Sequence, residues 1–434
     1  MPLPKLPYND GLSSTKAIAL SGIKGEVVTV EVDIADGLPG YSLLGLPDAA
    51  LNESRDRVRA ALVNSGQGWP NRKVTISLLP AWLPKSGSAF DLPIAMGILA
   101  ASEVVRGTEE MLFIGELSLE GNIRQTRGVL PSLICAYQNG IKQAVIPAAN
   151  LAEAKLIPEL KVFAFERLVD IIHWLHTGEL IDQPELDLKL DNSEHQLDFA
   201  DVAGQVMARR AAEIAAAGGH NFLMIGPPGV GKTMIAERLP SILPPLSKSE
   251  ALEVTAIHSI TNSDRAPLSE YAPFISPHHS TTRIAMVGGG AHVIKPGVCS
   301  LAHRGVLFID EAPECSGGVL DSLRQPLESG VASISRSSGT VTFPAKFILI
   351  LAANPCPCGR FAGRGRACEC SSLQVRRYLN RLSGPLLDRI DIQIRVEPPT
   401  RAAMSEGNKE ESSRVIQERV LAARSRSQER FKSY

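Results

Sequence analysis

The sequence has no apolar run that approaches the roughly 18 residues needed to cross a bilayer as a helix. Its first residues, Met1 to Tyr8, contain no apolar segment of the kind found in a secretory signal. From these two absences we expect a soluble protein of the cytoplasm. An excess of either charge is also absent, because 45 Lys and Arg face 46 Asp and Glu for a net charge of −1. This balance neither demands nor excludes a nucleic-acid partner, since a binding channel can be basic on an otherwise acidic protein.

Cysteine is scarce, and its seven copies in 434 residues are unevenly placed. Four of them crowd into one short loop: Cys356, Cys358, Cys368 and Cys370. An odd count with local crowding favours a metal site in a reducing compartment over a disulfide framework. The two C-x-C pairs predict a tetrahedral Cys₄ zinc site, with disulfides or four metal-free thiols as the alternatives. The same loop carries Arg360, Arg364 and Arg366, which we expect to form a basic projection toward DNA.

One stretch fits the phosphate-binding pattern G-x-x-x-x-G-K-[ST] at every position, between a short apolar run and a helical segment. Its residues are Gly226, Pro227, Pro228, Gly229, Val230, Gly231, Lys232 and Thr233. Glycines let the backbone curl so that its N–H groups face a phosphate, and the helix N-terminus adds its positive end. Lys232 can then reach the β- and γ-phosphates, and the Thr233 hydroxyl can hold Mg²⁺. The sequence therefore predicts a site for ATP and Mg²⁺.

Two later apolar runs end in polar side chains that suit the same site. The first is followed by Asp310 and Glu311, so we expect Asp310 to hold Mg²⁺ and Glu311 to polarise the attacking water. The second ends at Asn354, whose amide suits a sensor position that orients this water. Further on, Arg389 lies in a segment that resembles the arginine finger of AAA+ ATPases, which acts in a neighbouring subunit's site. Considered alone, this arginine would be a surface salt-bridge former.

The N-terminal region resembles the proteolytic domain of the Lon family, in residues 84–89 and 128–147. Lon-type proteases carry a catalytic serine in the first motif and a lysine in the second, and these positions here hold Ala89 and Leu130. Without a nucleophile or an amine to activate it, peptide hydrolysis is not expected. A shifted dyad from nearby residues is the alternative, and its candidates are Lys85, Ser86 and Ser88. We expect a degenerate α+β domain that serves docking or assembly.

We expect the chain to divide into four parts. These are a Lon-like domain over 1–178, an acidic linker over 179–200, an α/β AAA+ ATPase domain over 201–399 and the start of a helical lid over 400–434. The ATPase domain should hold a glycine-rich insert near 280–298, a β-hairpin near 331–343 and the Cys₄ loop at 356–370. Lys295 in the insert and Arg336 near the hairpin turn are the candidate DNA contacts.

An insert before the Asp310 strand and a hairpin before the Asn354 strand resemble the magnesium-chelatase and replicative-helicase branch of AAA+ proteins. Segments 277–280, 288–290, 323–328 and 354–359 resemble the YifB/ComM family of magnesium-chelatase-like ATPases. This resemblance implies a homo-hexameric, ATP-driven DNA motor for branch migration in natural transformation, with single-stranded and branched DNA in its central pore.

A second function class stays open at this point, a chelatase motor that drives a partner to insert Mg²⁺ into a porphyrin. Against it, the sequence lacks the D-x-S-x-S metal site of the chelatase partner subunit and has a Lon-like domain that the chelatase ATPase lacks. The family also continues into a lid with a second sensor arginine. Because the sequence ends at Tyr434, we expect this lid to be truncated.

Overall fold

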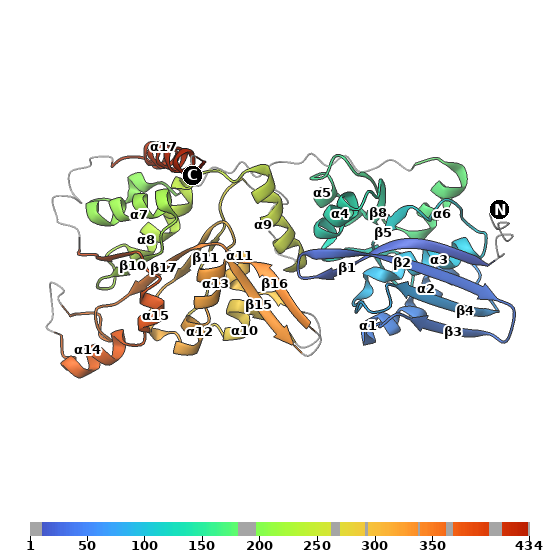
Figure 1. The fold of residues 1–434 in the computed structure, drawn as a ribbon, viewed down its shortest axis with the longest axis horizontal. Coiled ribbons are helices and arrows are strands. Elements are labelled where there is room, and N and C mark those ends of the chain that lie inside the picture. The colour runs from blue at the N-terminus through green and yellow to red at the C-terminus, as the bar shows by residue number, and fades with distance from the viewer. Residues whose placement is uncertain are drawn as a thin grey trace. The chain divides into compact units, whose positions relative to one another are not determined.

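Two separate sheets organise the chain, and the residues around each sheet form one unit. The computed structural model describes residues 11–180, 197–261, 270–290, 294–336, 339–361, 368–398 and 410–432 (Figure 1). The first unit takes in Met1–Lys189 with His258–Pro267, and the second Leu190–Ile257 with Leu268–Tyr434. Most of the expected linker and the beginning of the expected lid lie outside the described residues. Within the described ranges, no helix combines the length and apolar character that a membrane crossing requires.

The first unit contains a seven-stranded mixed sheet in which β1 pairs antiparallel with β2, and β2 with β4, while the other neighbours are parallel. In spatial order its strands are β3 (Gly40–Leu44), β4 (Lys73–Leu79), β2 (Lys24–Ala35), β1 (Leu12–Ser21), β5 (Met111–Phe113), β8 (Gln143–Pro147) and β9 (Lys161–Phe165). A small antiparallel pair joins β6 (Glu116–Leu117) to β7 (Ile123–Arg124). Side chains alternate along β2, so that Val28, Val30 and Val32 are fully buried.

The helices of the first unit cover this sheet, and one of them is apolar on every side. They are α1 (Ala49–Asn52), α2 (Ser54–Asn64), α3 (Asp91–Ala101), α4 (Val129–Gln138), α5 (Leu151–Ala154) and α6 (Leu168–Thr177). Ten of the eleven residues of α3 are buried, as expected of a helix that lacks a polar face. The helix ends at Ala101, and Glu103 shortly after it adopts a left-handed φ of +56°.

The second unit is built on a five-stranded, wholly parallel sheet. Its strands in spatial order are β11 (Phe274–Ile275), β14 (Val306–Ile309), β17 (Ile348–Ala353), β10 (Phe222–Ile225) and β18 (Ile392–Arg395). Its helices are α7 (Val206–Gly218), α8 (Lys232–Arg238), α9 (Lys248–Thr261, whose last residues belong to the first unit), α10 (Arg283–Val287), α11 (Val298–Leu301), α12 (Gly317–Asp321), α13 (Arg324–Ser329), α14 (Ser372–Leu379), α15 (Gly384–Leu387) and α17 (Ser413–Lys432). The coarse expectation of an α/β module with a parallel sheet is confirmed.

Both faces of this sheet are buried, and its strands are accordingly short apolar runs. Along β10, Phe222 and Met224 join one apolar cluster with α7 and α8, while Leu223 joins a second cluster with residues of α11 and α12. Figure 1 shows α7 and α8 on one side of the strands and α12 and α13 on the other. Both faces are therefore covered, and polar side chains concentrate where the strands end.

Two small antiparallel pairs interrupt the second unit. They are β12 (Gly288–Gly289) with β13 (Lys295–Pro296), and β15 (Val331–Arg336) with β16 (Gly339–Pro344). The insert and the hairpin touch, because a Cβ at Gly288 would lie 2.8 Å from Cδ1 of Ile334. The two inserted segments thus form one continuous structure.

The last described helix, α17, packs on the second unit's own α7. Ile416 and Val420 join the apolar cluster of α7, and the guanidinium of Arg424 donates to the carbonyl of Ala216 at 2.6 and 2.9 Å. This helix starts at Ser413, within the range 400–434 expected for the lid, and its assignment as a lid stays a prediction.

Candidate functional site

The phosphate-loop pattern follows β10 directly and leads into α8, which begins at Lys232. The turn requires glycine at specific points. Gly229 and Gly231 adopt left-handed φ angles of +77° and +91°. At Gly226 a Cβ would lie 2.4 Å from the carbonyl oxygen of Val396, so no side chain fits there. The backbone therefore curls as phosphate binding requires.

Lys232 folds over this loop and is 8% exposed. Its Nζ donates to the carbonyl oxygens of Gly226 at 2.6 Å and Pro227 at 3.0 Å, and to Asn354 Oδ1 at 3.2 Å. Burial lowers the pKa of this amine, and the carboxylates of Asp310 and Glu311 oppose that shift. The amine thus lies within the loop, with acceptors that phosphate oxygens can replace.

Thr233 and Asp310 lie side by side, although 77 positions separate them in the chain. The Thr233 hydroxyl donates to Asp310 Oδ2 at 3.0 Å, and the backbone N–H of Glu311 donates to Asp310 Oδ1 at 2.8 Å. A hydroxyl and a carboxylate are the hard oxygen donors that Mg²⁺ takes beside nucleotide phosphates. These residues fit the ion that the sequence assigned to them.

Glu311 follows with an exposed side chain and a φ of +47°, a region that residues other than glycine seldom occupy. Such backbone strain persists where the surrounding structure holds it, and it concentrates at functional sites. The turn directs the chain into the short helix at Ala312–Glu314. The position suits a group that acts on water beside the ion.

Asn354 lies at the end of β17, the strand between β10 and β14. Because the carboxyl ends of parallel strands meet at one edge, the phosphate loop, Asn354 and Asp310 all lie at that edge. The Asn354 side chain accepts from Lys232. Its backbone N–H donates to the hydroxyl of Tyr378 in α14, and burial raises the pKa of that phenol to about 12.

Sequence reasoning did not find Tyr378 or Arg381, both of which support the site. Arg381 donates to the carbonyl of Pro313 at 2.9 Å and to Glu314 at 3.2 Å, just after the paired carboxylates. The capping box at Ser371 signals where α14 begins, but not what the helix contacts.

Arg389 is half exposed and precedes β18. Its guanidinium pairs with Glu328 of α13, and none of its described contacts is to the phosphate loop or to Asp310. Its assignment as an arginine finger stays a prediction.

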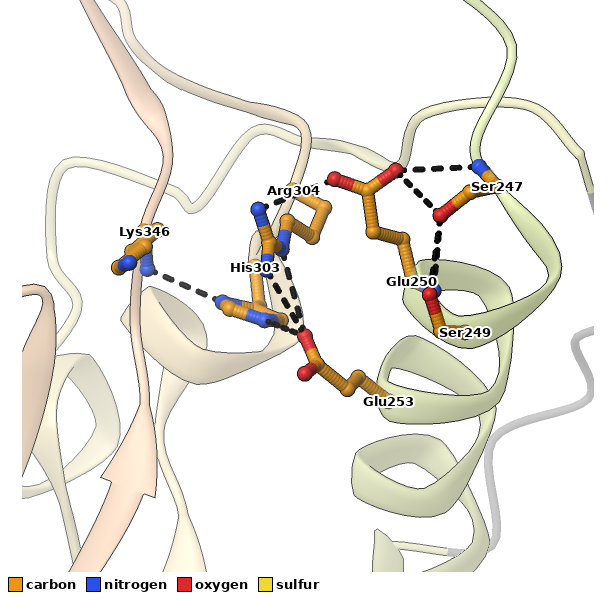
Figure 2. Close-up of polar contacts among 7 residues, drawn as sticks. All are labelled: Ser247, Ser249, Glu250, Glu253, His303, Arg304 and Lys346. Carbon is orange, nitrogen blue, oxygen red and sulfur yellow. Dashed lines mark hydrogen bonds and ion pairs between the residues drawn. The ribbon is translucent and has the colours of Figure 1, made fainter. Parts of the chain in front are cut away.

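A polar cluster that sequence reasoning also missed ties α9 to the starts of β14 and β17 (Figure 2). His303 is 2% exposed; its Nδ1 accepts from the backbone N–H of Lys346 at 3.0 Å, so Nε2 donates to Glu253 at 3.2 Å. Arg304 pairs with Glu250 at 3.0 Å and Glu253 at 3.2 Å. Burial lowers the pKa of His303. The cluster fixes where the strands that carry Asp310 and Asn354 begin.

The four clustered cysteines converge in space, with all sulfur atoms within 4.8 Å of one another. Cys356 Sγ lies 3.3 Å from Cys358 and 3.7 Å from Cys368, and the Cys358–Cys368 separation is 3.6 Å. A tetrahedron with Zn–S bonds of about 2.3 Å has sulfurs about 3.8 Å apart. The thiols are not joined by disulfides. The expected Cys₄ gathering is present, and its donors fit Zn²⁺.

Other predicted contacts are only partly described. Lys295 is exposed on β13, whereas the side chain of Arg336 lies outside the described residues. Arg360 is exposed, and Arg364 and Arg366 lie outside the described residues. Whether any of them meets DNA stays a prediction.

Two of the three candidates for a shifted dyad in the first unit, Lys85 and Ser88, are hydrogen-bonded to other groups. Lys85 is 1% exposed, and its Nζ donates to the carbonyls of Leu78 at 2.9 Å and of Pro80. The Ser88 hydroxyl donates to the carboxylate of Glu116 instead of facing Lys85. Ala89 and Leu130 occupy the positions of the Lon serine and lysine, and Leu130 is fully buried.

Comparisons with known proteins agree with this geometry. The family model "Magnesium chelatase, subunit ChlI" matches residues 198–404, and "Subunit ChlI of Mg-chelatase" matches residues 30–150. An uncharacterized protein of Mycobacterium tuberculosis is 46% identical over 96% of this chain and 83% of its own length. Uncharacterized protein YifB of Salmonella typhimurium is 44% identical, and Competence protein ComM of Haemophilus influenzae 41%, each over 95% of this chain and 82% of its own.

Weaker matches reach only part of the chain. The magnesium-chelatase 67 kDa subunit of Heliobacterium mobile is 26% identical over 37% of it, and Lon protease 1 of Myxococcus xanthus 23% over 41%. The fold and the nucleotide site define an ATPase module of the AAA+ class. The chain belongs to the YifB/ComM family of magnesium-chelatase-like ATPases, and the resemblance found in the sequence is confirmed.

Proposed function

We propose that this chain is the subunit of a hexameric ring in the cytoplasm that hydrolyses ATP to move DNA. In this proposal it drives branch migration when incoming single strands are integrated during natural transformation. One observation carries the proposal: an ATP site built from this chain's own residues occurs in a sequence 41% identical, over 95% of its length, to a protein named for competence.

The site residues divide the work of hydrolysis. Lys232 exchanges its carbonyl acceptors for phosphate oxygens, and Thr233 and Asp310 hold Mg²⁺, which neutralises charge on the phosphates when it is bound. Glu311 takes the proton of the attacking water, and the Asn354 amide orients that water. Arg389 leaves Glu328 to reach the site of the neighbouring subunit, where a guanidinium stabilises the transferred phosphoryl group.

DNA would meet the ring through the two inserted segments. The insert with Lys295 and the hairpin with Arg336 are in contact through Gly288 and Ile334, so the two segments can follow one strand. Contacts to backbone phosphates grip DNA without reading its sequence, which suits a motor.

Two further assignments belong to this proposal. The Cys₄ cluster holds one structural Zn²⁺, because four thiolates at these separations close a tetrahedral site with no open position. The first unit does not hydrolyse peptides, because Lys85 and Ser88 are bonded elsewhere and the matched positions are Ala89 and Leu130. The chelatase alternative is not favoured, since the chelatase subunit matches only 37% of this chain.

The test is ATPase activity measured with no DNA, single strands, duplex and four-way junctions, with Lys232→Ala as the inactive control. We expect single-stranded and branched DNA to stimulate hydrolysis. Equal rates under all four conditions, by protein shown to form rings, would contradict the motor.

A further inference from the structure

The strongest unassigned feature is the contact between the cysteine cluster and the phosphate loop. Cys356 and Cys358 begin a tight turn in which the backbone N–H of Gly359 donates to the carbonyl of Cys356 at 2.9 Å. The N–H of Phe361 then donates to Cys356 Sγ at 3.3 Å. We name this turn, residues 356–361, the cysteine knuckle.

The knuckle rests on the phosphate loop at one residue. Gly359 is buried with a φ of +73°, and a Cβ there would lie 2.8 Å from Cδ and 2.9 Å from Cγ of Pro228. Pro228 is the third residue of the phosphate-binding pattern, and Gly229, after it, adopts its own left-handed turn. The knuckle backbone is therefore packed directly against the segment that must curl around phosphate.

The chain on both sides of the cluster returns to the same site. Two residues before Cys356 lies Asn354, which accepts from Lys232. Beyond the last clustered cysteine, α14 brings Tyr378 back to the Asn354 backbone, and the turn after α14 brings Arg381 to Glu314. A metal that closes the four thiols thus joins the phosphate loop, Asn354 and the turn after Asp310 and Glu311.

We infer that the metal-closed cysteine knuckle positions the phosphate loop, so that metal occupancy sets the affinity of this chain for ATP. The inference rests on the zinc assignment of the proposed function. Without metal, the four thiols have no common ligand that holds them together. Cys358 and Cys368 then separate and Gly359 moves away from Pro228. The phosphate loop thereby loses a contact that supports its turn. With metal bound, the loop is ordered before ATP arrives, which removes part of the cost of binding.

The test uses the full chain as purified, with metal counted by mass spectrometry and the Kd of a fluorescent ATP analogue measured with Mg²⁺ and without DNA. Removal of the metal by a chelator, followed by exchange into chelator-free buffer, should weaken binding about tenfold, equivalent to about 1.4 kcal/mol. Added Zn²⁺ should restore it. Linkage requires the reverse effect as well, so ATP should tighten metal binding by the same factor.

Protein loaded with Co²⁺ adds a spectroscopic signature. Its thiolate-to-cobalt absorption should change when the ATP analogue binds, because the knuckle and the loop move together. An unchanged spectrum at saturating analogue counts against the coupling.

Variants distinguish the effect of the contact between Gly359 and Pro228 from the effect of the metal. Gly359→Ala keeps all four cysteines but pushes on Pro228, so it should retain about one metal per chain and bind the analogue about tenfold more weakly. The matched control is Gly317→Ala, where a Cβ meets nothing within 4 Å, and its Kd should equal the parent's. Cys358→Ser, at an exposed position, should lose both metal and affinity.

Parent affinity in both the metal-free protein and Gly359→Ala would overturn the inference. So would protein purified without metal whose four thiols all react with an alkylating reagent. Because no DNA is present, failure of DNA to stimulate hydrolysis leaves these results intact, and the motor proposal can fail separately.

Discussion

Among the described residues, each unit contains one almost fully buried lysine, and the two differ in what surrounds the amine. Lys85 and Lys232 both donate to backbone carbonyls, and burial lowers the pKa of each. Around Lys232 lie a glycine turn, the Asn354 amide and the charge of Asp310. Around Lys85 the described partners are carbonyls alone. A buried amine therefore marks a site only where groups that can bind or move charge converge on it.

The comparison is tested most strongly by removing each amine. Lys232→Ala should abolish ATP binding, weakening it by about 100-fold or more, because charge-assisted hydrogen bonds contribute about 1.5–3 kcal/mol each. Lys85→Met should leave ATP binding unchanged and lower the free energy of unfolding of the first unit by about 1–3 kcal/mol, since two carbonyls lose their donor. Fluorescence reports that unfolding selectively, because Trp69, Trp82 and Trp174 all lie in the first unit. Loss of ATP binding in Lys85→Met would break the comparison.

One carboxylate in each unit gives a second test of the same difference between the two units. Glu311→Gln should bind ATP like the parent and hydrolyse it about 100-fold more slowly or worse, the usual size of a lost general base. Glu116→Gln, which alters the carboxylate bonded to Ser88 in the first unit, is the matched control and should leave hydrolysis unchanged. Single-turnover hydrolysis separates the chemical step from binding. A parent rate in Glu311→Gln would show that another group polarises the water.

In the proposed function Arg389 acts in the nucleotide site of a neighbouring subunit, whereas the structure shows its guanidinium paired with Glu328. Arg389→Ala should keep the parent Kd for ATP and lose most hydrolysis, about 100-fold or more. Glu328→Ala, which frees the guanidinium, should not lose activity. Mixing Arg389→Ala with Lys232→Ala subunits should restore some hydrolysis at hybrid interfaces. Absence of rescue in rings shown to be mixed would leave Arg389 as a structural ion pair.

DNA binding should depend on the inserted segments of the second unit. The double variant Lys295→Ala/Arg336→Ala should bind single strands more weakly, and the slope of log K against log salt should become shallower by about 1.4, or 0.7 per lost contact. Lys161→Ala on the first unit's β9 is the charge control. Filter binding across a salt series measures both quantities. An unchanged slope would remove these two residues from the DNA surface without touching the ATP site.

The smallest expected effect is a difference in how the stability of each unit depends on pH. Burial raises the pKa of Asp91 in the first unit to about 6, so the folded state holds a proton that the unfolded state releases, and stability is lost as pH rises through 6. Burial lowers the pKa of His303, which faces Glu253, Arg304 and Lys346, so its contribution is lost as pH falls below about 6.5. The two units should therefore change stability in opposite directions between pH 7 and 5.

Asp91→Asn and His303→Gln should each remove their part of this slope, by at most about 1.4 kcal/mol per pH unit. Tryptophan fluorescence measures it for the first unit, and hydrogen exchange of β14 for the second. Parallel slopes in parent and variant would contradict the assignment for that residue.

Sequence alone went far with the nucleotide site because its chemistry is written in short contiguous patterns. Gly226 to Thr233 and the pair Asp310–Glu311 each fit a pattern with a predicted role, and each follows a buried parallel strand that sets its position. The structure then places Thr233 beside Asp310, which no spacing rule measures. The parallel α/β sheet followed from the same apolar runs.

What sequence missed depends on contacts between distant segments. Nothing in the sequence marks Tyr378 or His303, but the fold places one at Asn354 and the other between Glu253 and Lys346. The approach of Gly359 to Pro228 could not be predicted either, because the two residues are 131 positions apart in the chain.

The central claim is that the ATP site of the second unit powers the movement of branched DNA. The most direct measurement is the conversion of a labelled four-way junction into duplex products, by the parent chain and by Glu311→Gln, with and without ATP. The account predicts ATP-dependent conversion by the parent and none by Glu311→Gln, which should still bind the junction. Junction binding by parent rings that hydrolyse ATP yet never convert the junction would contradict it.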